Sequence, residues 1–467
     1  MVNGYSLLDL VRDIGNGHLG VLSINIEKNG VRIAALQNDL QGQDDKMIDR
    51  LVDGSKIIMP GQDPTRRWTR LNIMVVSFLK FCRDVDPWSL WTSSDLIFEH
   101  YSNLNNALLD DSYPVDALTE LFLSETEYVT KLAIKLDANN LDLGTKQSLF
   151  LSYISSIISK LFNSIKPPRD GANSTIPNKQ LILLNIINKL NNIYFRINSP
   201  QLCSNIFKNF KPKSMFESFK RYPIHEQIEF RYLLGRYYVI NFRMTNAFVQ
   251  LDTAFRMLCQ YMEQCPHTAT REILQRNLKR ILKYLIPVGI TIGKKPHFQA
   301  VRGIDLDLAK SYIELSRNVN SGNFKQVNFW LASNEDELKS QNLLLPLLQK
   351  LPILVFRNLF RKVVIEYVLS AQNNKISYDL LMRALQVSIG SDQLALPPMF
   401  KVIHRPEDVE NILVTLINLG FLRGNCFPAL RLCVVKKTTD INDIFPEMTE
   451  RIVKMFPLNN EDNWFDI

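Results

Sequence analysis

Three short patterns in the sequence could indicate a catalytic or cofactor-binding function. The first along the chain is rich in glycine. Gly15-Asn16-Gly17-His18-Leu19-Gly20 matches the G-x-G-x-x-G pattern of a dinucleotide-binding loop. Such a loop needs a strand before it, a helix after it and an acidic residue about twenty positions later, within a βαβ unit. Residues 7–12 have a helical pattern instead, and no βαβ alternation follows. We therefore expect these glycines to end a helix.

The second and third patterns involve cysteine and histidine. Cys259 and Cys265 lie near His267, but the spacing is not Cys-x-x-Cys and no second ligand pair follows, so we expect no zinc site. Cys426 and Cys433 lie on a predicted hairpin and are expected to be small packing residues. No His-Glu-x-x-His, Gly-x-Ser-x-Gly or Walker-type segment is present. The sequence therefore predicts no catalytic residue, metal or cofactor, and we expect that the chain is not an enzyme.

Basic side chains around the same hairpin could instead bind the phosphate groups of a nucleic acid. The helix before the hairpin begins at Pro406 with acidic residues and carries no Lys or Arg through Leu419, so base readout in a groove is not expected. We expect RNA and DNA binding without strong sequence preference, with Arg431 and Lys437 on one strand face and Lys436 on the other. The alternative is that these charges only keep the hairpin soluble. The predicted nucleic-acid-binding residues are Lys401, Arg405, Arg423, Arg431, Lys436 and Lys437.

The elements that must position this hairpin follow the order of a winged helix. Apolar residues at helical spacing begin at Ile376 and again at Val409, and the second run stops at Gly420. Residues 421–425 and 430–437 then have the pattern of two strands around a turn. The apolar content of residues 409–422 exceeds what one helix face of a small module needs. This surplus of apolar residues predicts that the module pairs with a second subunit. The alternative is that these residues fill the module's own core.

The chain before the winged helix has the pattern of paired helices. Leu234-Gly235 is followed by Tyr238, Ala247, Leu251 and Ala254 at the offsets of a tetratricopeptide repeat. Residues 312–330 have a similar helix–turn–helix pattern. Such repeats stack because none buries its apolar face alone. The alternative is two unrelated helical hairpins.

The predicted fold is therefore mainly α: a right-handed, tetratricopeptide-like solenoid that ends in a winged helix. We expect an N-terminal helical or irregular segment over residues 1–65, the repeat array over 66–370, the winged-helix subdomain over 371–440 and a C-terminal tail over 441–467. The loop over residues 166–177 is the expected flexible connection.

Composition and charge fit a folded chain with a polyanionic or acidic ligand. Of 467 residues, 46% are hydrophobic and 22% are charged, which is ordinary for a globular protein. No run of about 18 apolar residues predicts a membrane span, and six scattered cysteines predict an intracellular, reducing compartment. Residues 1–150 have a net charge of −7, residues 151–300 of +15 and residues 301–467 of zero. A basic middle of this size favours acidic partners, although solvated helix faces are the alternative.

Helical repeats that lead into a winged helix resemble the PCI family, and several longer stretches are similar to the fungal PCI subunits of transcription-export complex two. The resemblance runs from about residue 84 to the C-terminus. The stretches that carry it are Asp84–Ser89, Leu161–Arg169, Asn188–Ile197, Cys203–Phe210, Arg231–Tyr238, Tyr284–Pro287, Phe356–Phe360 and Asn425–Lys437.

This resemblance implies a non-catalytic nuclear subunit, associated with the nuclear pore, that couples transcription to mRNA export. It implies two protein partners, a large PCI-like scaffold subunit and a small acidic disordered chain, with paired winged helices as a platform for nucleic acid. The alternative is a purely structural PCI subunit of a signalosome- or proteasome-lid-like assembly without nucleic-acid binding. We expect the acidic partner to contact the basic residues Lys208, Lys211, Lys213, Lys220 and Arg221.

Overall fold

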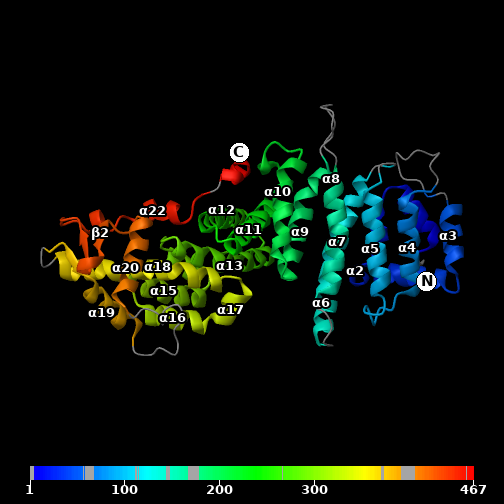
Figure 1. Cartoon of the computed structure of the whole chain (residues 1–467). Coiled ribbons are helices and arrows are strands. Elements are labelled where there is room, and N and C mark those ends of the chain that lie inside the picture. The colour runs from blue at the N-terminus through cyan, green and yellow to red at the C-terminus, as the bar shows by residue number, and fades with distance from the viewer. Residues whose placement is uncertain are drawn as a thin grey trace. The chain divides into compact units, whose positions relative to one another are not determined.

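The computed structural model describes residues 5–55, 57, 68–110, 113, 115–142, 148–166, 178–265, 267–369, 373–390, 405–458 and 460–466. The chain forms two compact units, residues 1–226 and 227–467. Most of the described residues are helical, and one small antiparallel sheet lies near the C-terminus (Figure 1). The predicted mainly α class, with helical pairs followed by a winged helix, is confirmed. The predicted domain boundaries stay predictions, and the expected flexible loop falls largely on residues 167–177, outside the described residues.

Unit 1 consists of helices that pack side by side in chain order. The glycine pattern ends a helix as predicted, because α1 closes at Gly15 and Gly17 adopts a φ of 82°. The elements of unit 1 are α1 (Leu7–Gly15), η1 (Leu19–Leu22), α2 (Ile26–Leu40), α3 (Asp45–Gly54), α4 (Arg70–Asp84), α5 (Ser94–Leu108), α6 (Asp116–Asp142), α7 (Leu149–Ser164), α8 (Asn178–Leu181), α9 (Leu183–Arg196), η2 (Pro200–Leu202), α10 (Cys203–Lys213) and η3 (Phe219–Arg221). Helix α11 (Ile224–Ile240) contains the division between the units.

One histidine, His100, lies in the core of unit 1 and has a structural role. His100 on α5 is fully buried, and its Nδ1 lies 3.2 Å from the Ser77 hydroxyl on α4. Burial lowers the pKa of His100 to about 4, because the charged imidazolium is poorly solvated in the core. The ring is therefore neutral at physiological pH and is shielded from solvent, which makes it a packing residue.

Unit 2 continues the helical pairs and ends in the sheet and a C-terminal segment. Its elements after α11 are α12 (Met244–Glu263), α13 (Thr268–Thr291), α14 (Phe298–Ile304), α15 (Leu306–Ser321), α16 (Phe324–Ser333), α17 (Glu335–Ser340), α18 (Leu344–Val363), the π-helical turn η4 (Val364–Leu369), β1 (Lys375–Ser377), α19 (Tyr378–Ile389), α20 (Pro406–Asn418), β2 (Gly424–Phe427), η7 (Pro428–Leu430), β3 (Leu432–Val435), α21 (Ile441–Ile444), α22 (Met448–Met455) and η8 (Asn460–Asp466).

The predicted repeat signature marks a close crossing of α11 and α12. A Cβ atom on Gly235 would lie only 2.6 Å from the Leu251 side chain, so nothing larger than glycine fits there. Ala247, Leu251 and Ala254 on α12 are completely buried. Small residues at these offsets therefore allow the two helices to approach, as the sequence pattern predicts.

The sheet has the strand order β1-β3-β2, with both pairs antiparallel. The expectation that a helix begins at Ile376 is wrong, because Ile376 lies in the middle of β1 and is paired with Cys433 on β3. The predicted strand limits also differ from the structure: β2 begins and ends later than the predicted 421–425, and β3 is shorter than the predicted 430–437. Cys433 is fully buried, in agreement with its predicted packing role, and the half-buried Cys426 lies opposite it on β2.

The C-terminal segment lies along α11 and α12 as a strap, defined here as residues 456–458 and 460–466. Arg231 on α11 is buried, and its Nη2 donates to the Phe465 carbonyl at 2.7 Å and to the Asp466 carboxylate at 2.9 Å. Tyr238 and Gln250 donate to the two oxygens of Asp462 at 2.6 and 3.1 Å. Buried polar groups need partners of this kind, so the strap completes the core of unit 2.

The aromatic residues of the strap supply its apolar contacts. The ring of Phe465 packs edge-on against Phe230 with a centroid distance of 5.1 Å, and Phe465 is 8% exposed. At the start of the strap, Thr245 donates to the Phe456 carbonyl at 2.9 Å. The strap is thus held at both ends.

We predict that Phe465→Ala destabilises unit 2 by about 3 kcal/mol, the usual cost of truncating a buried aromatic residue. Urea unfolding of the full chain, followed by circular dichroism, measures this loss. Leu458→Ala is the matched control, because Leu458 lies on the same strap but is 49% exposed. Equal unfolding midpoints for the two variants would show that the strap contributes no stability.

Candidate nucleic-acid and partner interfaces

The base of the winged helix is fixed to the repeats by a polar joint around Gly322. The Ser388 hydroxyl on α19 donates to the Gly322 carbonyl at 2.6 Å and accepts from the Phe324 backbone N–H at 3.0 Å. Gly322 has a φ of 70°, and a Cβ there would lie 2.7 Å from the backbone of Leu359 on α18. Glycine is needed both for the left-handed turn and for this approach. Ser388 is not among the residues predicted from the sequence.

A second joint connects α18 to the chain that follows the hairpin. Arg357 is buried, and its Nη2 donates to the Pro446 carbonyl at 2.8 Å, while its Nη1 donates to the Asn358 side chain at 3.0 Å. Burial, with a smaller contribution from the charge of nearby Arg361, lowers the pKa of Arg357 to about 10. The guanidinium therefore stays charged at neutral pH, and its hydrogen bonds hold the segment after β3 in place.

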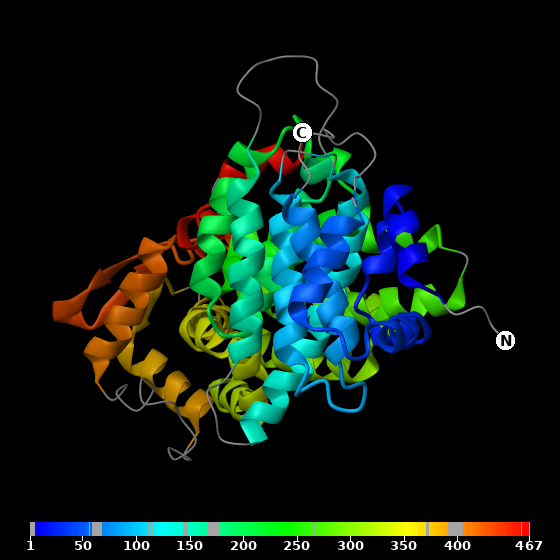
Figure 2. The same ribbon diagram turned by 90° about the vertical axis from the view of Figure 1, so that its right-hand side faces the viewer.

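The hairpin itself projects outward from α20 (Figure 2). Gly424 pairs with Val435, so Arg423 and Lys436 are opposite each other at the open end, with Lys437 next along the chain. Arg431 lies beyond the other end of the four-residue strand β3, roughly 15 Å away at the usual rise per residue. The structure therefore brings Arg423, Lys436 and Lys437 together and places Arg431 separately at the tip.

The expectation that Arg431 and Lys437 share one strand face is wrong. Arg431 precedes β3 and adopts the left-handed conformation with a φ of 51°, and Lys437 follows the strand's end at Val435. The alternation of strand faces does not extend to either residue. All four basic residues of the hairpin are exposed.

One of these charges is partly balanced within the protein. Lys436 Nζ lies 2.7 Å from the Asp443 carboxylate, and the Thr438 hydroxyl donates to the same oxygen at 3.0 Å. The hydrogen bond from Lys436 is the main cause that lowers the pKa of Asp443, with smaller contributions from Thr438 and the charge of Arg423. Asp443 is therefore ionised at neutral pH and offsets one of the positive charges at the open end.

The helix before the hairpin has no such basic surface. Arg405 is exposed at the N-terminal cap of α20, where its backbone N–H donates to the Asp408 carboxylate at 2.9 Å. Lys401 lies outside the described residues. Glu407 and Asp408 occupy the first turn of α20. Acidic side chains there stabilise the helix through its dipole, and their negative charge repels phosphate.

The apolar residues of this end divide between the module's core and its surface. Val409, Leu413 and Leu416 are buried, so one face of α20 fills the module's own core. Val414 on α20 is 40% exposed, and Leu430 at the hairpin tip is 68% exposed. The surface of the module therefore combines exposed apolar and basic side chains.

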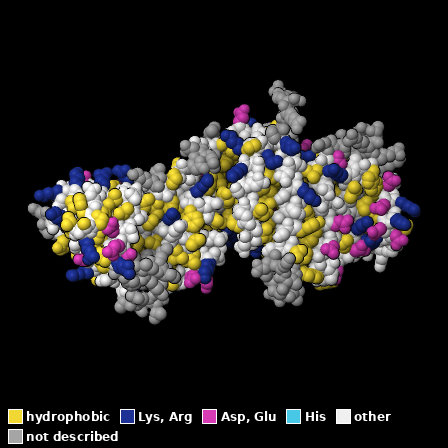
Figure 3. All heavy atoms as spheres, viewed as in Figure 1, with side chains coloured by type: hydrophobic (Ala, Val, Ile, Leu, Met, Phe, Trp, Pro, Cys, Tyr) yellow, Lys and Arg dark blue, Asp and Glu magenta, His cyan; other side chains and the backbone are white. Residues whose placement is uncertain are grey.

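Figure 3 shows Lys and Arg side chains gathered at the end of unit 2 that carries the hairpin.

The second predicted basic cluster belongs to unit 1 and lies on α10 and η3. Packing of Phe210 on α10 edge-on against Phe219 on η3, with a centroid distance of 6.1 Å, holds these two elements together. Four basic residues of the cluster are exposed: Lys208, Lys211, Lys220 and Arg221.

The fifth residue of that cluster, Lys213, points inward. Its Nζ donates to the carbonyls of Asn163 and Ile165 at 3.2 and 3.0 Å and lies 4.9 Å from the centre of the Phe162 ring. Burial lowers the pKa of Lys213, and the charge of Lys166 adds to this effect. Lys213 therefore caps the C-terminal end of α7, where a cation is favoured by the helix dipole.

The described ranges contain neither a metal-binding cluster nor a membrane-spanning helix. Among the residues that the structure describes, no three His, Cys, Asp or Glu side chains are grouped so that they could hold a metal ion. No helix within those same ranges is long and apolar enough to cross a bilayer.

Comparison with known proteins agrees with the architecture. The PCI domain family model matches residues 331–437. The chain is 47% identical, over 97% of its length and 99% of the relative, to the nuclear mRNA export protein THP1 of Saccharomyces cerevisiae. It is 27% identical to a PCI domain-containing protein 2 homolog of Dictyostelium discoideum, over 62% of this chain and 59% of the relative. A homolog of the same name in Drosophila melanogaster is 31% identical over 42% of this chain and 45% of the relative.

We predict that Lys213→Met lowers the free energy of unfolding by about 1 kcal/mol, because it removes two hydrogen bonds from the end of α7. Lys208→Met is the matched control, since Lys208 is exposed on the same helix. Chemical denaturation of the full chain measures both. If Lys208→Met were equally destabilising, the structural role assigned to Lys213 would not hold.

Proposed function

The chain belongs to the PCI-domain family, and from this premise we propose that it is a non-catalytic subunit of a nuclear complex that couples transcription to mRNA export at the nuclear pore. In this proposal it pairs with a large PCI-like scaffold subunit and a small acidic protein, and the assembly binds RNA and DNA. The observation that carries the proposal is 47% identity, over nearly the whole length of both chains, to a nuclear mRNA export protein. Its localisation is accordingly the nucleus, at the pore.

The basic hairpin supports the nucleic-acid part of the proposal. Arg423, Lys436 and Lys437 converge at one end of it, and Arg431 occupies the tip. Such a spread of charge suits a phosphate backbone, whereas the acidic start of α20 disfavours insertion of that helix into a groove. Binding through phosphate contacts is independent of base sequence.

Exposed apolar residues beside this basic surface support pairing with the scaffold. Val414, Phe427 and Leu430 are 40–68% exposed and lie on α20 and the hairpin. Exposed apolar side chains are suited to the centre of a protein–protein interface, which buries on the order of 1,200–2,000 Å². We propose that they face the winged helix of the scaffold subunit.

The four exposed basic residues of α10 and η3 support the acidic partner. A disordered acidic chain binds through several charge contacts and loses conformational entropy as it orders. Because Lys213 is engaged by α7, the contact residues in this proposal are Lys208, Lys211, Lys220 and Arg221.

We predict that replacing Arg423, Arg431, Lys436 and Lys437 with Glu in the assembled complex greatly weakens RNA and DNA binding. The slope of log affinity against log salt concentration should become shallower by about three units, since each free phosphate contact contributes about one. Lys436 contributes less because Asp443 already neutralises part of its charge. Fluorescence anisotropy at two or more salt concentrations measures the slope.

The control for this experiment reverses four exposed charges outside the winged helix, at Lys46, Arg50, Lys131 and Lys339. This control should bind nucleic acid nearly as wild type does. If the hairpin variant kept both its affinity and its salt slope, nucleic acid would have to bind elsewhere, or the assembly would be a structural one of the signalosome or proteasome-lid kind.

We predict that Lys208→Glu, Lys211→Glu and Arg221→Glu together weaken binding of the acidic partner, and that high salt reduces the difference from wild type because charge contacts are screened. Isothermal titration calorimetry with the purified partner measures the affinity. The triple variant Lys46→Glu, Arg50→Glu and Lys131→Glu controls for net charge. If the variant with Lys208, Lys211 and Arg221 replaced kept its affinity, the acidic partner would have to bind another surface.

A further inference from the structure

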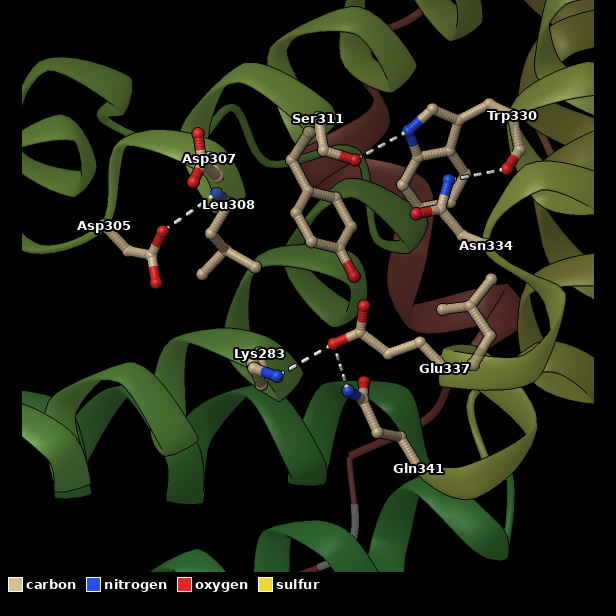
Figure 4. A pocket seen from close by; sticks show the side chains of 11 residues that line it. Lys283, Asp305, Asp307, Leu308, Ser311, Trp330, Asn334, Glu337 and Gln341 are labelled. Carbon is tan, nitrogen blue, oxygen red and sulfur yellow. Dashed lines mark hydrogen bonds and ion pairs between the residues drawn. The ribbon is translucent and has the colours of Figure 1, made fainter.

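A pocket of about 370 Å³ opens between α13, α15, α16 and α17 in unit 2. This volume lies within the range of ligand pockets, roughly 300–1,000 Å³. Figure 4 shows its labelled side chains converging from these helices. None of the residues predicted to bind nucleic acid or the acidic partner lines it.

The nitrogen donors on the pocket wall already have partners. Lys283 Nζ and Gln341 Nε2 both bond to Glu337 Oε1, at 2.8 and 2.9 Å. The Trp330 indole N–H donates to the Ser311 hydroxyl at 3.0 Å, and the Asn334 amide donates to the Trp330 carbonyl at 2.8 Å. Figure 4 marks these bonds as dashed lines.

The acceptors, by contrast, have capacity left. Tyr312 is only 5% exposed, yet its hydroxyl makes no hydrogen bond with any residue that the structure describes. The Asn334 side-chain oxygen and the Asp307 carboxylate are likewise without a hydrogen-bond donor within the described ranges. The Tyr312 hydroxyl and these two oxygen groups are therefore available to a ligand that enters the pocket.

The charge of the wall has the sign that suits a cation. Three carboxylates line the pocket, from Asp305, Asp307 and Glu337, against one lysine, Lys283. Lys279 lies 3.5 Å from Asp305 and offsets part of this charge, so the wall remains acidic by about one charge. Burial raises the pKa of Tyr312, and the charge of Glu337 raises it further, so the phenol stays protonated. Phosphate would be repelled here, unlike at the hairpin.

We propose that this pocket binds the side chain of an arginine in a basic segment of a partner protein. A guanidinium has five N–H donors and no acceptor, which matches a wall whose acceptors are unfilled and whose nitrogen donors are engaged. It is more weakly hydrated than the ammonium of lysine and packs against aromatic rings, here those of Tyr312 and Trp330, whose centroids are 5.2 Å apart. The pocket thus selects a partner opposite in charge to the one proposed for α10.

Fluorescence anisotropy of the full chain with a fluorescein-labelled Gly-Ser-Arg-Ser-Gly peptide tests the proposal. The same peptide with citrulline in place of arginine, which is neutral and nearly the same shape, should bind at least about tenfold more weakly. Tyr312→Phe, which keeps the ring, and Asp307→Asn should each weaken the arginine peptide about tenfold, the loss expected for one hydrogen bond to a charged group.

The matched control is Glu272→Gln on α13, an exposed carboxylate outside the pocket, which should leave the affinity unchanged. Circular dichroism melting checks that each variant is folded. The proposal is overturned if the citrulline peptide binds equally well, or if folded Tyr312→Phe and Asp307→Asn both bind like wild type. It is also overturned if an RNA oligonucleotide displaces the peptide competitively. The pocket variants should not change the salt slope of RNA binding, which separates this test from that of the hairpin.

Discussion

The architecture of unit 2 depends on two buried arginines that each donate a hydrogen bond to the end of the chain. Arg231 on α11 and Arg357 on α18 each bond to a backbone carbonyl of the C-terminal segment, at Phe465 and Pro446. An arginine keeps its charge in proteins, and a buried charge without acceptors costs several kcal/mol. The C-terminal segment therefore supplies acceptors that these two buried charges use in the packed structure. The C-terminal segment is a structural part of the repeats and of the winged-helix base.

This constraint explains how a small module can present a defined surface. Arg357 fixes the chain after β3, and Ser388 fixes α19 to the turn at Gly322. With both ends of the module attached, the hairpin projects from a base that is bonded to the repeats. The two proposed ligand surfaces then differ in kind. The hairpin presents exposed positive charge, which suits phosphate, whereas the pocket at Tyr312 presents enclosed acceptors, which suit a guanidinium.

The order of elements was predictable because its signals are local. Helical periodicity ending at Gly420 and the small residues of the α11–α12 crossing sit within a few turns of the elements they specify. The strand β1 was missed because three residues are too short to show alternation. The inward position of Lys213 depends on carbonyls 48 and 50 residues away, and the strap bonds join residues more than 200 positions apart. Contacts at such separations leave no periodic trace in one sequence.

The central claim is that the chain functions within a nuclear export assembly, and the composition of that assembly tests it most directly. The full chain would be tagged at its native locus, purified from nuclear extract, and its co-purifying chains identified by mass spectrometry. The account predicts a larger PCI-like chain and a small acidic chain in equal molar ratio with it. Recovery of signalosome or proteasome-lid subunits in their place, or of the tagged chain alone, would contradict it.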